Sequence, residues 1–206
     1  LGGYKILPKT LLLLEVDYGT INYHRTGNAN QDYWQIFSGV RGEPTEKMDL
    51  LAKVGFQDRQ LADVPGQGPQ DDFDGVVANV DWNYDLTDLD ALRLNYLRSV
   101  KTSTFAENSW LRQDKISGSY RKRFWNKWAL TPQLGWQYNH YPELATAGGV
   151  TKRRNDNFWS ASIELRYEIQ DWLSTGIVYR FRSRNSNMDP FDFDNNRLAV
   201  DISFVY

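Results

Sequence analysis

The sequence lacks cysteine, has only two histidines and contains no long apolar run. The absence of cysteine excludes disulfides, cysteine-ligated zinc and thiol chemistry. The mean hydropathy is −0.62, and no stretch reaches the roughly 18 apolar residues that a transmembrane helix requires. The formal net charge is only −2, so the overall charge gives no sign of nucleic-acid binding.

Signatures of catalysis and of cofactor binding are also scarce. No phosphate-binding glycine loop is present, and we expect neither a cofactor nor a metal. A Ser–His hydrolase would need His140 beside a hydroxyl such as Ser103 or Ser109, together with a third orienting group, and the spacing does not favour this. The acidic stretches 70–74 and 188–194 lack EF-hand spacing, so we interpret them as polar loops. The sequence therefore predicts a protein that is not an enzyme.

What the sequence does contain is extended segments of alternating polarity. In segment 158–169, for example, Trp159 and Ile163 share one face of a strand, and Ser160 lies on the other. Arg98 is an exception, because it falls among apolar neighbours, and a bulge or a position near a rim would explain it. The pattern predicts about eleven strands, at 1–7, 10–23, 33–41, 47–59, 73–84, 88–104, 109–123, 126–140, 156–169, 172–185 and 195–206.

Two kinds of connection alternate between these segments. Short links such as "LPKT", "DLTD" and "IQDW" alternate with longer polar ones at 24–32, 60–72, 141–156 and 186–196. The link around "AENS" is the short exception in the second set. Short turns on one rim and long loops on the other are typical of outer-membrane β-barrels, whose turns face the periplasm. A soluble β-sandwich has no reason to sort its connections in this way.

Aromatic residues make up 15% of the chain, and their positions form two bands. The band beside the short turns contains Trp82, Tyr84, Phe124, Trp125, Trp128, Tyr167, Trp172, Phe204 and Tyr206. The band near the long loops contains Tyr33, Trp34, Trp110, Tyr138, Phe158 and Trp159. Two bands indicate the interfacial girdles of a membrane barrel. A soluble barrel with a large aromatic core is the alternative, but it would concentrate these residues in the middle of the strands.

The number of strands bears on the size of the barrel. If the chain ends at the periplasmic rim, segment 1–7 descends toward that rim too, and eleven is an odd number. Bacterial single-chain barrels have even numbers of strands. We therefore expect an all-β fold, an antiparallel transmembrane β-barrel with about eleven strands here and twelve or more in the full barrel. Residues 1–206 are expected to be one domain in the bacterial outer membrane, the C-terminal part of a longer chain.

The stretch "TGIVYRFRSRN" at 175–185 places three arginines on alternate positions. A strand directs these arginines to one face and Ile177, Tyr179 and Phe181 to the other, and we expect the arginine face to line the lumen. The predicted lining residues are Arg93, Lys115, Arg121, Arg123, Glu164, Arg166, Arg180, Arg182, Arg184, Arg197 and Asp201. Two interpretations of the arginines stay open. They set anion selectivity, or they brace the wall in a salt-bridge ladder, with Glu164 and Asp201 as the expected acids.

Four stretches carry a family resemblance: "LEVDYGTINY", "GVRGEPTEKMDLLAKVGFQDR", "LRLNYLRSVKTSTF" and "TGIVYRFRSRNSNMDPFDFDNNRLAVDISFVY". They are similar to an outer-membrane β-barrel porin family associated with exopolysaccharide export. The resemblance covers nearly the whole chain but is one of style, without a catalytic signature. It implies an exporter or porin for a polysaccharide, and it assigns no further role to any single residue.

Three hypotheses of function follow. The first is a porin-like channel for export or passage of polysaccharide or of other, anionic, solutes through a charged lumen. Its partners would be outer-membrane lipid, the transported solute and export proteins of the periplasm. The second is a plugged structural or adhesive barrel that binds a partner through its extracellular loops, and the third is an outer-membrane enzyme. Nucleic acid is not an expected partner, because the basic stretch "YRKRFWNKW" lies at a short turn.

Overall fold

The computed structural model describes residues 2–24, 29–63, 70–103 and 108–204. These residues form one antiparallel sheet of eleven strands, in which every strand pairs with the next along the chain. The strands are β1 (Gly2–Leu7), β2 (Thr10–Ile21), β3 (Gln31–Thr45), β4 (Met48–Leu61), β5 (Phe73–Asp85), β6 (Asp90–Thr102), β7 (Trp110–Phe124), β8 (Trp128–Ala147), β9 (Val150–Gln170), β10 (Leu173–Ser186) and β11 (Phe193–Phe204). All eleven predicted strands are confirmed.

The described part of the chain has little helix. It contains a short 3₁₀-helix, η1 (Asp189–Phe191), in the connection between β10 and β11. It holds no helix with the length and apolar character needed to cross a bilayer. The β-strands therefore build the whole architecture, as the period-2 patterning predicts.

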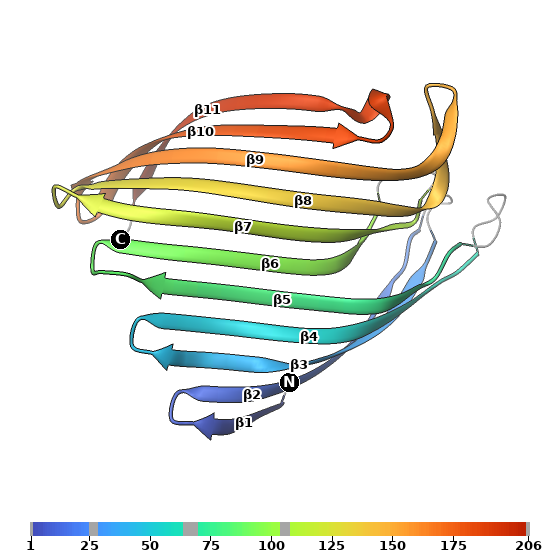
Figure 1. The fold of residues 1–206 in the computed structure, drawn as a ribbon, viewed down its shortest axis with the longest axis horizontal. Helices are drawn as coiled ribbons and strands as arrows, with labels where there is room; N and C mark the ends of the chain where they lie inside the picture. The colour runs from blue at the N-terminus through green and yellow to red at the C-terminus, as the bar shows by residue number, and fades with distance from the viewer. Residues whose placement is uncertain (1, 25–28, 64–69, 104–107, 205–206) are drawn as a thin grey trace.

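The sheet curves but does not close on itself within the described residues. Figure 1 shows the strands side by side in chain order, with β1 and β11 at opposite edges. Each strand runs opposite to the one before it, so every second strand has the same direction. The first and the eleventh strands, β1 and β11, therefore run the same way. Direct pairing of these two edges would be parallel, whereas an even number of strands closes with antiparallel pairs throughout.

The connection predicted as a loop at 141–156 is instead a continuous hairpin. Strands β8 and β9 are 20 and 21 residues long and pair out to Ala147 and Val150. The two residues between them, Gly148 and Gly149, have φ angles of +59° and +77°. A two-residue hairpin turn of this kind needs positive φ at both positions, which glycine adopts without strain. The loop prediction was wrong because the polar side chains of this stretch were given more weight than its Gly-Gly turn signal.

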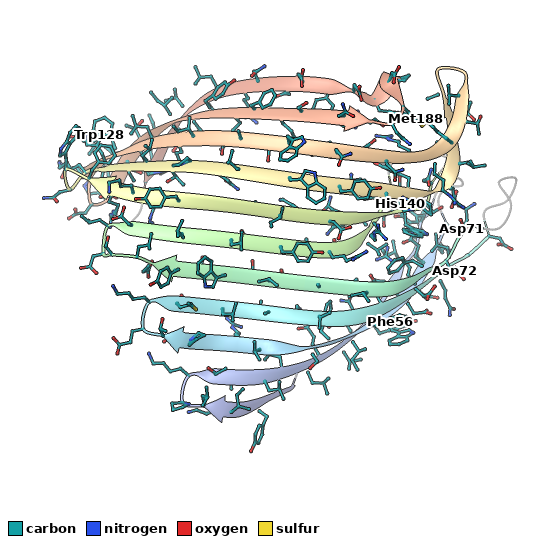
Figure 2. All side chains as sticks on the ribbon, viewed as in Figure 1. Phe56, Asp71, Asp72, Trp128, His140 and Met188 are labelled. Carbon is teal, nitrogen blue, oxygen red and sulfur yellow. The ribbon has the colours of Figure 1, made fainter. Side chains whose placement is uncertain are left out.

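The two faces of the sheet differ in chemistry. Residues that lie opposite one another in neighbouring strands share a face of the sheet. Arg182 lies opposite Ser160, Ser160 opposite Gly135, and Gly135 opposite Ser117, so all four are on one face. We call the face with these residues the inner face and the opposite one the outer face. Large apolar side chains stand exposed along the outer face, among them Val16, Ile36, Val54, Val76, Leu134, Trp159, Ile163, Ile177, Leu198 and Val200. Figure 2 shows how densely the side chains cover the sheet.

The aromatic bands are mostly where the sequence places them. Near the short turns, Trp82 stacks on Tyr84 with ring centroids 5.7 Å apart, and Trp172 stacks on Phe204 at 6.4 Å. In the long-loop band the prediction fails for Tyr33 and Phe158. Both lie on the inner face, since their register partners are the inner residues Arg59, Arg184 and Gln137. Tyr206 lies outside the described residues.

Candidate functional site: the charged inner face

The predicted lining residues share one face of the sheet. Cross-strand register places all of them on the inner face: Arg93, Lys115, Arg121, Arg123, Glu164, Arg166, Arg180, Arg182, Arg184, Arg197 and Asp201. The face does not gather them into one cluster. They divide between a group near the short turns and a row that follows β10 toward the long loops.

The arginine row of β10 has an uneven set of contacts. Arg180 is exposed and has no ion-pair partner within 4 Å among the described residues. Arg182 is also exposed, and its guanidinium lies 4.6 Å from the centre of the Phe158 ring. Arg184 differs, because its Nε donates a hydrogen bond to the carbonyl oxygen of Phe191 in η1. Two of the three arginines are therefore exposed on the inner face, and the third anchors a loop.

The acids expected to neutralise this row are engaged elsewhere. Glu164 accepts hydrogen bonds from Arg166, with its Oε1 2.8 Å from Nη2, and Asp201 Oδ2 lies 3.2 Å from the same nitrogen. The expectation that Glu164 and Asp201 pair with the β10 arginines was wrong. The physical reason is register: these acids lie opposite Val178 and Gly176, which are two and four positions before Arg180. A salt-bridge ladder exists here, but it is centred on Arg166.

The group near the short turns surrounds a cavity of about 250 Å³ formed by β6, β7, β8 and β9. Arg93, Arg121 and Arg123 line it together with the Arg166 ladder. Arg123 Nη2 forms an ion pair of 2.8 Å with Glu168. Arg93 and Arg121 have no ion-pair partner among the described residues. This end of the inner face thus holds more basic than acidic groups.

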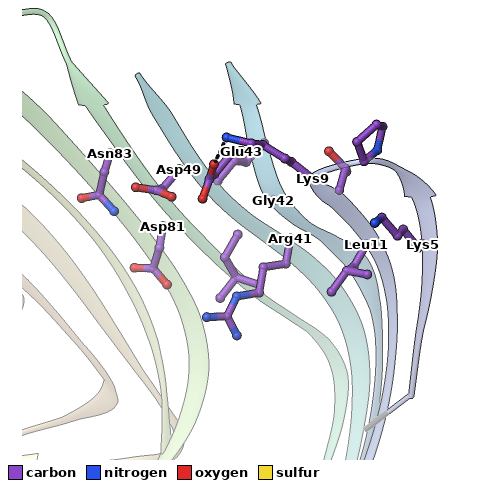
Figure 3. A pocket seen from close by; sticks show the side chains of 13 residues that line it. Lys5, Lys9, Leu11, Arg41, Gly42, Glu43, Asp49, Asp81 and Asn83 are labelled. Carbon is purple, nitrogen blue, oxygen red and sulfur yellow. Dashed lines mark hydrogen bonds and ion pairs between the residues drawn. The ribbon is translucent and has the colours of Figure 1, made fainter. Parts of the chain in front are cut away.

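A larger hollow of about 900 Å³ lies over β1 to β5 at the same end. Figure 3 shows Arg41, Asp49 and Asp81 lying around it from different strands, with the ion pair between Lys9 and Glu43 at its edge. That pair joins Nζ and Oε2 at 2.7 Å. Acidic and basic residues are mixed here. This agrees with the sequence, in which acidic residues are more frequent in the early strands than in the late ones.

The structure reveals a buried ion pair that the sequence analysis missed. Arg154 and Asp156 are 4% and 0% exposed, and Nη2 lies 2.6 Å from Oδ2 while Nε lies 2.9 Å from Oδ1. The guanidinium also lies 3.7 Å from the ring centre of Phe191 and 4.7 Å from that of Tyr141. The β10–β11 connection therefore packs onto the inner face of β9, and Met188 beside it is 3% exposed. The signal was present, because Arg154, Asp156 and Phe158 continue the period-2 pattern of β9.

Aromatic side chains also lie on the inner face. Tyr33, Phe37 and Phe158 all project to this side by register. Each of the three rings lies against a cation. Lys53 Nζ is 4.5 Å from the Phe37 ring centre, and the Arg59 guanidinium is 5.0 Å from that of Tyr33. Such contacts hold long basic side chains against the wall.

The residues considered for enzymatic or metal chemistry have structural contacts. His140 Nδ1 lies 2.7 Å from Asn155 Oδ1, and Ser109 Oγ donates to Gln70. In the acidic stretches, Asp72 accepts a hydrogen bond from the backbone of Leu61. No group of three or more histidine, cysteine or acidic residues within the described ranges is arranged to hold a metal ion. Figure 2 labels His140, Asp71 and Asp72 near the long-loop end of the sheet.

A curved antiparallel sheet with an apolar exposed outer face and a charged inner face defines the wall of an outer-membrane β-barrel channel. The chain belongs to the family described as "Putative beta-barrel porin 2", whose model matches residues 2–206. No curated protein matches the sequence. The fold and the family place the protein in the bacterial outer membrane.

Two solved structures of outer-membrane proteins are similar to this chain. The outer membrane channel DcaP of Acinetobacter baumannii superimposes with a TM-score of 0.71 at 15% identity, over 99% of this chain and 61% of that one. A variant of OmpT, an outer membrane protein of Vibrio cholerae, that lacks loop L8 gives a TM-score of 0.47 at 14% identity, over 95% of this chain and 61% of that one. The chain thus spans about three fifths of the length of each of these proteins.

Proposed function

We propose that the protein is a passive channel whose lumen favours anionic solutes. The observation that carries this proposal is the pair Arg180 and Arg182, exposed on the inner face without an ion-pair partner among the described residues. Side chains two positions apart on a strand are separated by ~7 Å, so their positive potentials overlap. Rings and rows of one charge set selectivity in channels by raising the local concentration of the opposite ion.

Arg197 extends this positive surface to the neighbouring strand. It lies directly opposite Arg180 in the β10–β11 ladder and likewise has no ion pair within the described ranges. Arginine suits carboxylate and phosphate groups, because its planar fork of donors matches their two oxygens. Acidic polysaccharide is the cargo that we propose on this chemistry together with the family resemblance. Ring faces such as Phe158 beside Arg182 support it, since they supply apolar contact for sugar rings.

A working channel requires that the edges at β1 and β11 be covered. Unpaired backbone groups at a sheet edge are too costly in lipid, so only closed barrels span a bilayer with strands. We propose that the complete barrel contains twelve or more strands and that further strands cover the two edges of this sheet. The parallel direction of β1 and β11 supports an odd number of additional strands between them.

The adhesive alternative has one observation in its favour. The β8–β9 hairpin continues past the neighbouring strands and exposes Leu144 and Val150 near its tip, at 63% and 50%. Exposed apolar residues on a projecting element are suited to contact with a partner. In that case the lumen would carry no current, which separates the two functions.

Reversal potentials in planar bilayers test the channel. The purified full-length protein should conduct and should favour chloride over potassium across a salt gradient. The variant R180Q/R182Q should shift the permeability ratio toward unity, because it removes two exposed charges from the lumen. The control K47Q/K127Q removes two lysines from the short turns and should leave the ratio unchanged. Absence of any ion-permeable state would refute the channel, and an unchanged ratio in R180Q/R182Q would refute the role of the arginine row.

A further inference from the structure

Strands β5 and β6 separate before they reach the long-loop end. Their ladder runs from the pair of Asp85 and Ala91 to the pair of Ala78 and Arg98, and within the described residues it goes no further. Beyond that point, residues 73–77 pair only with β4 and residues 99–102 only with β7. Figure 1 shows β6 bending away from β5 toward this end. The unusual position of Arg98 in the sequence pattern thus marks the place where the wall divides.

A cavity of about 300 Å³ lies at this division. Most of its lining residues come from the inner faces of β3, β4, β5 and β6, so it opens from the lumen. Its charged lining residues are Lys53, Arg59, Arg98 and Lys101, and all four are basic. No carboxylate is among the described residues that line it.

The neighbouring acids neutralise only part of this charge. Lys53 Nζ lies 2.8 Å from Glu15 Oε1, which compensates one lysine. Arg98 Nε is 3.5 Å from Asp114, but the same carboxylate is 3.4 Å from a second arginine, Arg112.

The remaining two cations have no acid beside them. Arg59 donates to the neutral amide oxygen of Gln31 at 2.8 Å, and Lys101 has no ion pair among the described residues. The cavity therefore keeps a net positive charge.

Two buried donors at this place also lack an acceptor. Arg59 is only 5% exposed, and its Nε has no hydrogen-bond partner. The hydroxyl of Ser99, which lines the same cavity, is likewise buried without a hydrogen-bond partner. A buried guanidinium without full hydrogen bonding is costly, and an anion that supplies several oxygens would remove that cost.

We propose that this cavity is an anion-binding subsite in the channel wall, which takes the carboxylate or phosphate group of a solute in transit. Its volume lies near the lower end of the range for small-molecule sites, so it admits one sugar-sized group. Arg59 and Lys101 supply the uncompensated charge, and the hydroxyl of Ser99 supplies a further donor. This proposal rests on the proposed anion channel and adds to it a site in the channel wall where the solute binds.

Equilibrium binding to the detergent-solubilised full-length protein tests the subsite independently of conductance. Isothermal titration with glucuronate and with inorganic phosphate should show saturable binding of at least one of them, and glucose should not bind. The tighter of the two anions identifies the preferred group. The variant R59Q/K101Q should weaken that binding by at least about tenfold, since each lost partner is a charge-assisted hydrogen bond.

The control K5Q removes one charge from the inner face of β1 at the other end of the sheet and should bind like the wild type. Heat-modifiable gel migration shows whether each variant is folded, and R59Q with Lys101 intact replaces the double variant if the latter is not. Binding of neither anion, or unchanged affinity in the folded variant, would overturn the subsite. If the protein conducts selectively but binds neither anion, the subsite is refuted and the channel is not. If it binds an anion but does not conduct, the channel is refuted and the binding site is not.

Discussion

Removal of Asp156 should destabilise the barrel strongly. Its carboxylate is fully buried and forms a bidentate pair with Arg154, at 2.6 Å and 2.9 Å. In D156A the guanidinium stays near the rings of Phe191 and Tyr141 but loses the carboxylate of Asp156. Breaking a buried ion pair by removing one partner costs about 3–5 kcal/mol, because an uncompensated charge stays buried.

The same structure predicts that removal of both partners costs far less. A buried ion pair replaced by apolar side chains of similar volume is often neutral or even stabilising. The double variant R154M/D156L keeps an elongated side chain against Phe191 and removes both charges. We therefore expect its free energy of unfolding to lie within about 1 kcal/mol of the wild-type value, well above that of D156A.

Reversible urea unfolding of the protein refolded into lipid vesicles measures these differences. Linear extrapolation gives the free energy of unfolding for wild type, R154M, D156L, D156A and the double variant. Wild type, R154M, D156L and R154M/D156L form a double-mutant cycle that isolates the interaction between the two side chains. A loss below about 1 kcal/mol in D156A would refute the reasoning. So would a double variant as unstable as D156A, because the cost would then come from packing.

Two further predictions concern the faces and the edges of the sheet. I163R places a charge on the exposed outer face and should cost about 2–4 kcal/mol in vesicles, whereas S162R on the inner face should change stability by about 0.5 kcal/mol or less; equal costs would contradict the assignment of faces. In the full-length protein, the cysteine pair K5C/S203C at the two edges should not form a disulfide on oxidation, while the register partners S174C/S203C should. Efficient crosslinking of K5C/S203C would show that β1 and β11 close the barrel directly. No cysteine within residues 1–206 competes with either pair.

Much of the fold could be predicted from the sequence because a membrane wall imposes a strict period of two. One face must meet lipid and the other water, so a residue such as Trp159 or Ser162 reveals its side by its position alone. The strand ends are less certain, because outside the bilayer polar residues extend a strand as readily as they form a loop. This is why the hairpin from His140 to Asn155 looks like a polar loop in the sequence.

The partners of the charged residues could not be predicted in the same way. Period two gives the face of Glu164 and Arg180, but only the stagger between strands decides which residues become neighbours. A shift of two positions between β9 and β10 keeps every face unchanged but decides whether Glu164 lies opposite Arg180 or, as observed, opposite Val178. In the observed register Glu164 pairs with Arg166 of its own strand. Charge pairing therefore depends on a register that the pattern of faces leaves undetermined.

The same reasoning explains why the proposed subsite is invisible in the sequence. Lys53 and Arg59 look like ordinary inner-face cations of β4, and Lys101 looks like one of β6. The three line one cavity at the place where β5, the strand between them, parts from β6 at Ala78 and Arg98. In a closed ladder, backbone pairing would leave no space for a ligand between the strands. The total charge of the lumen would not by itself create a binding site, because cations without space between them only repel one another. The separation of β5 and β6 provides that space, and an anion bound there would offset the repulsion.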